Sequence, residues 1–231
     1  LPEKFLKVKV TDYKNSLIIP GLVDLHLHAP QFPNIGLGLD KELIPWLETY
    51  TFPEESKYDD IEYSKKVYSK LIKEIWKYGT TRCCVFATIH KESCKLLIEL
   101  FNTSGLGAYV GKVNMDYDSP INLLEDTDNS INDTEELLKE YRDKFPLVKP
   151  IITPRFVPSC SDKLLKSLGE LAIKYNVPVQ SHLSENRGEI KMVADRYPNE
   201  PNYASVYNSS NLLGQTKTIM AHCIHLSDEE I

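Results

Sequence analysis

Residues 17–28 read LIIPGLVDLHLH, an apolar run that is broken once by Pro20-Gly21 and ends in two histidines. The apolar positions of the run, 17–27, are mostly consecutive rather than alternating, which is typical of a strand buried on both faces of a parallel sheet. Five further apolar runs rich in β-branched residues follow at positions 80–89, 108–115, 148–156, 177–183 and 218–224. The sequence therefore predicts six parallel strands.

Amphipathic segments fill the gaps between these runs. In residues 61–78 the apolar side chains fall on one stripe with lysines outside it, as on a helix that packs one face against a sheet. Further helices, each opened by a serine or another polar cap, are predicted at 93–101, 130–145 and 161–175, and another begins at Ser227. Strands that alternate with helices predict an α/β protein with a parallel sheet.

The length of the chain limits how much of a closed barrel it can form. A barrel of eight strand–helix units takes about 250 residues, and this chain of 231 residues has six strand runs plus long connections. The connections at 29–60 and 196–215 are rich in Pro, Asn and Tyr, and we expect them to be loops that cover a site.

The charge balance excludes two classes of partner. Lys and Arg number 27 against 33 Asp and Glu, a net charge of −6. An acidic chain offers no basic footprint for nucleic acid and no polybasic segment for a membrane surface. The five cysteines are odd in number and lack zinc-ribbon spacing, which indicates reduced thiols in a cytoplasmic protein. Cys83 and Cys84 are expected to pack as small apolar residues, not to act as nucleophiles.

Histidines recur where the predicted strands end. His26 and His28 are two positions apart and point to one face of a strand, where both imidazoles can bind one metal ion. His182 ends VPVQSH, His222 ends TIMAH, and His90 ends VFATIH. The carboxyl ends of parallel barrel strands converge on one face. We therefore expect His26, His28, His182 and His222 to meet, although buried core histidines remain the alternative.

Four further residues stand close to these strand ends. Glu185, three positions after His182, can take a proton from a metal-activated water, or it can be an acid favoured by a helix N-terminus. Arg155 and Phe156 end their strand with a planar donor fork and a stacking face, which suit a flat polar heterocycle. The alternative is that Arg155 pairs with an acidic loop. Gln31 can both donate and accept hydrogen bonds.

Several segments resemble the guanine deaminase branch of the amidohydrolase superfamily. They are PGLVDLHLHAPQ, LDKELIPWLETYTFPEE, GTTRCCVFATIH, VKPIITPRF, VQSHLSEN and IMAHCIHLSDEE. The resemblance runs from about Ile18 to the end of the chain. It implies a (β/α)8 TIM barrel, a small β-sandwich built from both chain ends, and one zinc ion per chain. The implied reaction is the hydrolysis of guanine to xanthine and ammonia.

The resemblance also implies roles for individual residues. The positions that match the zinc ligands are His26, His28 and His182. Glu185 matches the residue that transfers protons, and His222 matches the histidine that polarises the attacking water. The positions that match the purine-binding residues are Gln31, Arg155 and Phe156. Binuclear relatives carry a carboxylated lysine near the end of strand four, but here that strand ends Thr153-Pro154-Arg155 without a lysine and Lys149 stands at its other end, so one metal is favoured over two.

The resemblance implies a division of the chain as well. Residues 1–17 are expected to be a remnant of the N-terminal β-sandwich, and residues 18–231 an incomplete barrel with strands one to six. The family's aspartate ligand on strand eight is absent from the sequence, so we expect the chain alone to be inactive. The implied partners are a small-molecule purine and a second copy of the chain. A zinc-dependent deaminase of a related purine or pyrimidine ring, or a non-catalytic binding module, remains the alternative.

Overall fold

The computed structural model describes residues 3–5 and 7–231 and is an α/β structure in which every strand pairing is parallel. One sheet has the order β1-β2-β3-β5, made of β1 (Leu22–His28), β2 (Thr80–Phe86), β3 (Gly107–Gly111) and β5 (Val148–Pro150). β4 (Val113–Asn114) continues β3 and pairs with β6 (Thr153–Pro154), which continues β5. β7 (Val179–Leu183) pairs with β8 (Thr218–His222). The predicted α/β class with parallel strands is confirmed.

Proline and glycine set where several strands begin or break. The first run was predicted from residue 17, but β1 begins only at Leu22. Pro20 has no N–H to donate to a sheet, and a Cβ on Gly21 would lie 2.2 Å from Cγ2 of Thr81. The run at 148–156 is divided into β5 and β6, each of which ends in a proline. A parallel bridge between Ile152 and Val179 links this run to β7.

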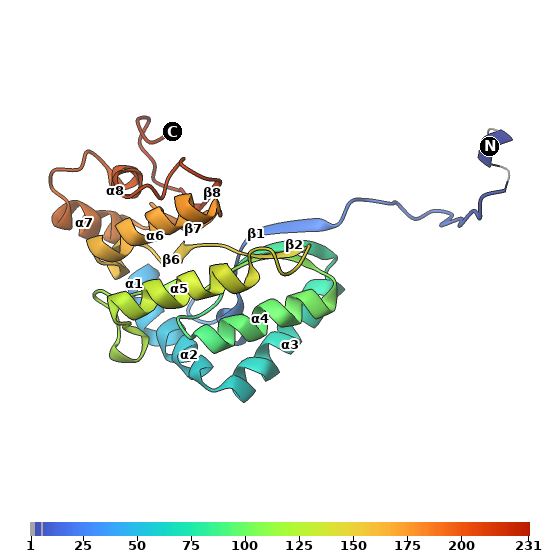
Figure 1. The fold of residues 1–231 in the computed structure, drawn as a ribbon, viewed down its shortest axis with the longest axis horizontal. Helices are drawn as coiled ribbons and strands as arrows, with labels where there is room; N and C mark the ends of the chain where they lie inside the picture. Colours follow the sequence, from blue (N-terminus) through green and yellow to red (C-terminus); the bar gives the residue numbers. More distant parts are fainter. Residues whose placement is uncertain (1–2, 6) are drawn as a thin grey trace.

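Four long helices lie where helices were predicted, with shifted bounds. They are α3 (Ile61–Lys77), α4 (Lys91–Ser104), α5 (Thr127–Tyr141) and α6 (Asp162–Tyr175). Side chains of Asp60, Asp126 and Ser161 accept hydrogen bonds from the first turns of α3, α5 and α6. Each helix contacts the next, so the four form a layer over the strands (Figure 1).

The connection at 29–60 was predicted as a loop, and this prediction is wrong. It folds into short helical pieces: η2 (Ala29–Asn34), α1 (Leu43–Trp46), the π-helical η3 (Leu47–Thr51), α2 (Phe52–Glu55) and η4 (Ser56–Asp59). Pro53 follows directly on the π-helical η3, in which the N–H of Phe52 donates to the carbonyl of Leu47, and has no N–H of its own to continue that ladder. The connection between β7 and β8 holds α7 (Arg187–Arg196) and α8 (Tyr203–Ser209), which the sequence analysis also missed.

The helix predicted to begin at Ser227 is absent among the described residues. Ser227 does make the contacts of a helix start, since its N–H and its hydroxyl both donate to Oε2 of Glu230, at 2.9 and 3.1 Å. Only a turn follows, closed by a bond from the N–H of Glu230 to the carbonyl of Ser227.

Buried apolar side chains form three clusters among the described residues, two of them large and one small around Phe86 and Met115. The first large cluster lies between α3, α4 and β2 and includes Leu71, Leu97 and Val85. The second lies between α6, β7 and α8 and includes Leu168, Val179 and Tyr207. Cys83 and Cys84 are buried free thiols, as expected. Among the described residues no helix combines the length and the apolar character that a bilayer span requires.

The N-terminal segment leaves the body of the structure. Residues 7–21 run away from the strands, and a short 3-10 turn at Glu3–Phe5 is the one helical element of the described residues before β1 (Figure 1). The β-sandwich remnant predicted over residues 1–17 includes residues 1, 2 and 6, which lie outside the described residues. That assignment stays a prediction.

Candidate active site

Four histidines from three strands meet at one end of the strands. The ring centroid of His26 lies 5.0 Å from His28, 4.9 Å from His182 and 5.0 Å from His222. His28 and His182 stack at 5.0 Å, and their Nε2 atoms are 2.9 Å apart. The expectation that these four side chains converge is therefore confirmed in space. His90 lies outside the group, with Nδ1 3.7 Å from Oδ1 of Asp59.

The electrostatics of this group favour neutral imidazoles. Burial, with the neighbouring charge of His222 and Arg155, lowers the pKa of His26 to about 4. Burial is also the largest cause that lowers the pKa of His28 and of His182 well below the usual value. Burial lowers the pKa of His222 as well. A neutral imidazole has a free lone pair, which is the form that binds a metal ion.

The hydrogen bonds of His182 determine which of its nitrogens is free. Its Nδ1 lies 2.6 Å from the backbone carbonyl of Arg155, and a carbonyl can only accept, so Nδ1 carries the proton. Nε2 then has a lone pair and faces Nε2 of His28 at 2.9 Å. Two ring nitrogens at this distance must share either a proton or a cation.

A cation fits the donors that are present. Ring nitrogens of His26, His182 and His222 lie within 4.8 Å of one another and could hold a metal ion. His28 adds a fourth nitrogen beside His182. Nδ1 of His26 and Nδ1 of His28 have no hydrogen-bond partner among the described residues, although both atoms are buried. Buried imidazole nitrogens that face one another, as Nε2 of His28 and Nε2 of His182 do, are an arrangement that a metal ion stabilises.

Side chains from β2 and α8 hold the histidines in place. Phe86, at the end of β2, stacks on His28 at 4.5 Å and lies edge-on to His26 at 5.2 Å. The hydroxyl of Tyr207 donates to the carbonyl oxygen of His182 at 2.7 Å and lies 2.8 Å from the hydroxyl of Ser181. The sequence analysis identified neither Phe86 nor Tyr207 as part of the site.

Glu185 lies across from His222, with Oε2 3.3 Å from Nε2 of the histidine. Burial and, to a smaller extent, the charge of Glu189 raise the pKa of Glu185 to about 7, against the opposing effect of Arg155. The backbone N–H of Glu185 donates to Oε1 of Glu189 at 2.6 Å. Ser184 and His222 have φ angles of 50° and 72°, in the left-handed region that residues other than glycine seldom adopt.

Arg155 and Gln31 face each other across Glu55. Nη1 of Arg155 donates to Oε2 of Glu55 at 2.5 Å, and Nε2 of Gln31 donates to Oε1 of the same carboxylate at 3.0 Å. The ring of Phe52 lies 5.1 Å below the guanidinium. Arg155 does pair with an acidic residue, as the alternative interpretation held, yet it also lines the cavity beside the histidines.

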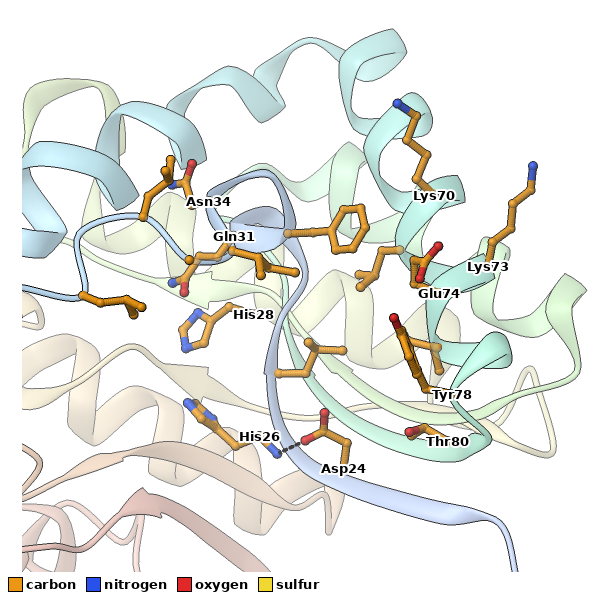
Figure 2. A pocket seen from close by; sticks show the side chains of 18 of the residues that line it. Asp24, His26, His28, Gln31, Asn34, Lys70, Lys73, Glu74, Tyr78 and Thr80 are labelled. Atoms are coloured by element: carbon orange, nitrogen blue, oxygen red, sulfur yellow. Dashed lines mark hydrogen bonds between the residues drawn. The ribbon is translucent and has the colours of Figure 1, made fainter.

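All eight predicted site residues line one cavity of about 100 Å³. Leu43, Trp46 and Leu47 close it from the helical segment that follows η2. A wider cavity of about 800 Å³ opens beside it, between β1 and α3, and shares His26, His28, Gln31 and Trp46 with it. Figure 2 shows His26, His28 and Gln31 projecting side by side from β1 and η2. The residues that the sequence analysis missed are Trp46, Phe52, Glu55, Phe86 and Tyr207.

Several known proteins are similar to this chain in sequence and in fold. The chain matches the amidohydrolase family over residues 17–231. Guanine deaminase of Dictyostelium discoideum is 48% identical over 223 residues, which are 96% of this chain and 49% of that protein. Human guanine deaminase is 43% identical over 219 residues, 94% of this chain and 48% of that protein. The chain spans about half the length of these relatives.

Solved structures of guanine deaminases are similar to this chain in fold as well. A crystal structure of guanine deaminase from C. acetobutylicum with guanine bound in its active site matches all of this chain with a TM-score of 0.98 and 54% identity, over 55% of that chain. E. coli guanine deaminase matches 91% of this chain with a TM-score of 0.87 and 35% identity, over 48% of that chain. The chain therefore belongs to the amidohydrolase family.

Proposed function

We propose that the protein that carries this chain hydrolyses guanine to xanthine and ammonia. The observation that supports this most directly is the shared cavity, in which four histidines and Glu185 lie opposite Arg155, Gln31 and Phe156. One side of the cavity can activate a water, and the other can hold a flat ring with polar edges. The relatives that are guanine deaminases, one of them with guanine bound, support the choice of substrate.

We propose one zinc ion as the cofactor, with His26, His28 and His182 as ligands. Imidazole nitrogens suit zinc, and a catalytic zinc site commonly has three protein ligands. The neutral state of the rings and the 2.9 Å approach of His28 to His182 support this set. When bound, zinc supplies a water that loses a proton near neutral pH. His222, close to both His26 and Glu185, is placed to polarise that water.

Glu185 is proposed to move protons between water and substrate. Its carboxylate accepts a proton from the attacking water as the oxygen bonds to C2 of guanine, and it delivers this proton to the adjacent ring nitrogen. The second water proton then passes to the amino group as the C2–N bond breaks, so xanthine and ammonia leave. Contact with His222 keeps the carboxylate beside the reacting atoms.

Arg155, Gln31 and Phe156 are proposed to bind the purine. The guanidinium donates to the acceptors O6 or N7 at the edge away from the reacting carbon. Phe156 is buried at the cavity wall and offers an apolar face to the ring. Trp46 and Leu47 close the cavity over the site and limit the access of bulk water.

The remaining proposals concern the whole protein. We propose that the six strand runs belong to an eight-stranded barrel, because they follow one another in sequence order with parallel pairing and outer helices. Residues 1–17 are proposed to belong to the β-sandwich and residues 18–231 to the barrel. A cytoplasmic homodimer is the proposed state of the protein.

Ammonia release tests the function and separates it from its alternatives. The protein that carries this chain is loaded with zinc and incubated with guanine, 8-oxoguanine, adenine and cytosine. We expect turnover of guanine well above that of the other three rings. Turnover of another ring with none of guanine would replace this proposal with a related deaminase, and no turnover with zinc bound would indicate a binding module.

A further inference from the structure

Glu55 is a buried carboxylate that connects the two proposed purine-binding residues. Its side chain is 2% exposed, and that of Arg155 is 3% exposed. Oε2 accepts from Nη1 of Arg155 and Oε1 accepts from Nε2 of Gln31, at 2.5 and 3.0 Å. Glu55 comes from α2 and its partners come from η2 and the end of β6, so it links three elements that are distant in sequence.

The chemistry of Glu55 determines which way the amide of Gln31 faces. A carboxylate paired with a guanidinium is ionised and can only accept hydrogen bonds. The amide nitrogen of Gln31 must therefore face Glu55, because the amide oxygen in that place would oppose the carboxylate. The oxygen of Gln31 is then the polar atom turned away from Glu55, and Gln31 lines the cavity beside His26. Gln31 is thereby fixed as an acceptor toward a ligand.

Glu55 determines the orientation of Arg155 in the same way. Within the described part of the chain, both hydrogen bonds of the guanidinium leave from Nη1, one to Glu55 and a longer one to Sδ of Met115 at 3.9 Å. The ring of Phe52 lies against the same guanidinium. Nη2 and Nε are left to donate to a ligand. Arg155 is thereby fixed as a donor.

We propose that Glu55 is a positioning residue that makes the cavity selective for purines with a lactam edge, an N–H beside a C=O. The proposal rests on the proposed function. In guanine, N1–H can donate to the oxygen of Gln31 while O6 accepts from Arg155. In a purine whose N1 lacks a proton, N1 is an acceptor and would face the oxygen of Gln31, which is also an acceptor. Neither atom would then have a hydrogen-bond partner, and this strongly disfavours binding.

2-Aminopurine provides a direct comparison with guanine. It carries the same amino group on C2, so the same C2–N bond breaks and ammonia leaves, with 2-oxopurine as the purine product in place of xanthine. It lacks the N1–H and O6 of the lactam. The ratio of kcat/KM for guanine to kcat/KM for 2-aminopurine therefore reports recognition of the lactam edge and cancels effects on the reaction itself.

The test uses Glu55→Gln in the whole zinc-loaded protein. The new amide can donate to the oxygen of Gln31, so Gln31 is free to turn over and present its nitrogen to the ligand. We expect the preference for guanine over 2-aminopurine to fall by at least about 10-fold, mainly through a higher KM for guanine. Glu54→Gln is the matched control, because Glu54 is buried on the same helix but bonds to Tyr63 and Lys57. It should keep the preference.

Gln31→Met is the second variant, in case Glu55→Gln does not fold. It leaves the pair between Arg155 and Glu55 intact and removes the acceptor. The same loss of preference is expected from it, and the double variant should lose no more than either single variant. A preference unchanged in Glu55→Gln, or in Gln31→Met, overturns the inference and leaves the proposed function standing. An unmutated protein without guanine turnover overturns both.

Discussion

Nε2 of His28 and Nε2 of His182 lie 2.9 Å apart, although the two residues are 154 positions apart in sequence. The carbonyl of Arg155 holds the proton of His182 on Nδ1, so the lone pair of its Nε2 faces His28. A metal ion between the rings would replace an unfavourable contact of two lone pairs with two coordinate bonds.

We therefore predict that His182→Ala abolishes stoichiometric zinc binding in the whole protein. The remaining histidines would keep an affinity lower by more than about 10-fold, since loss of even a supporting residue costs that much. Metal analysis after dialysis against a weak chelator measures the effect. His225→Ala is the control, because His225 is exposed and outside the group. Equal zinc in folded His182→Ala protein would refute the ligand assignment.

Removal of zinc is predicted to destabilise the protein. An ion that binds only the folded state adds about 2.7 kcal/mol at a free concentration 100 times its dissociation constant. Without it, Nε2 of His28 and Nε2 of His182 face each other at 2.9 Å with no ion between them. A strong chelator should therefore lower Tm by several degrees, and added zinc should restore it. A Tm that does not respond to chelator would show that the histidines hold no structural metal.

Glu185→Gln is predicted to keep zinc and lose turnover. The amide is close in size to the carboxylate and can stay beside His222, but it cannot accept and release a proton. The expected fall in kcat is at least about 10²-fold, the usual contribution of a general acid–base residue. Steady-state kinetics with zinc analysis on the same sample measure both quantities. A kcat within a few-fold of the unmutated value would exclude proton transfer by Glu185.

The strand ends of the site could be predicted from sequence because parallel strands carry a strong local signal. His28, His182 and His222 each end a strand, and these strand ends meet at one face of the structure. The predicted burial on both faces holds for β7 but is wrong for β1, where Leu22, Val23 and Leu25 are exposed. Arg155 and Glu185 could be predicted for the same reason, because each lies just past the end of a strand. The positions of these residues in the sequence do not determine their individual roles, which were inferred from the resemblance to the family.

The residues missed in the sequence analysis act through packing between distant segments. Glu55 lies in a connection predicted as a loop, and its partner Arg155 is 100 positions away. Tyr207 lies on α8, in a connection expected to be irregular. The sequence shows two adjacent glutamates in TFPEE, and an acidic partner for Arg155 could be expected. No local sequence pattern indicates which acidic residue is buried beside the arginine.

Arg155→Lys is predicted to lower kcat/KM for guanine by at least about 10-fold. An ammonium has no planar fork, so it cannot hold Glu55 and present two further fixed donors to the purine. Arg142→Lys is a suitable control, since Arg142 pairs with Asp143 at the surface. Kinetics with guanine measure the change, and an unaltered kcat/KM would leave Arg155 with a structural role only.

Tyr207→Phe is predicted to weaken both folding and the metal site. The buried hydroxyl donates to the carbonyl of His182 and contacts Ser181, so its loss leaves an unsatisfied acceptor at the strand end that carries the histidine. A buried unsatisfied group costs about 1–3 kcal/mol. Denaturant unfolding should show that loss, and zinc affinity should fall because the backbone of His182 loses its support. Tyr197→Phe removes a hydroxyl that bonds to the exposed Asp162, and it should change stability by less than about 0.5 kcal/mol. If Tyr207→Phe were as mild as Tyr197→Phe, the hydroxyl would have no part in holding His182.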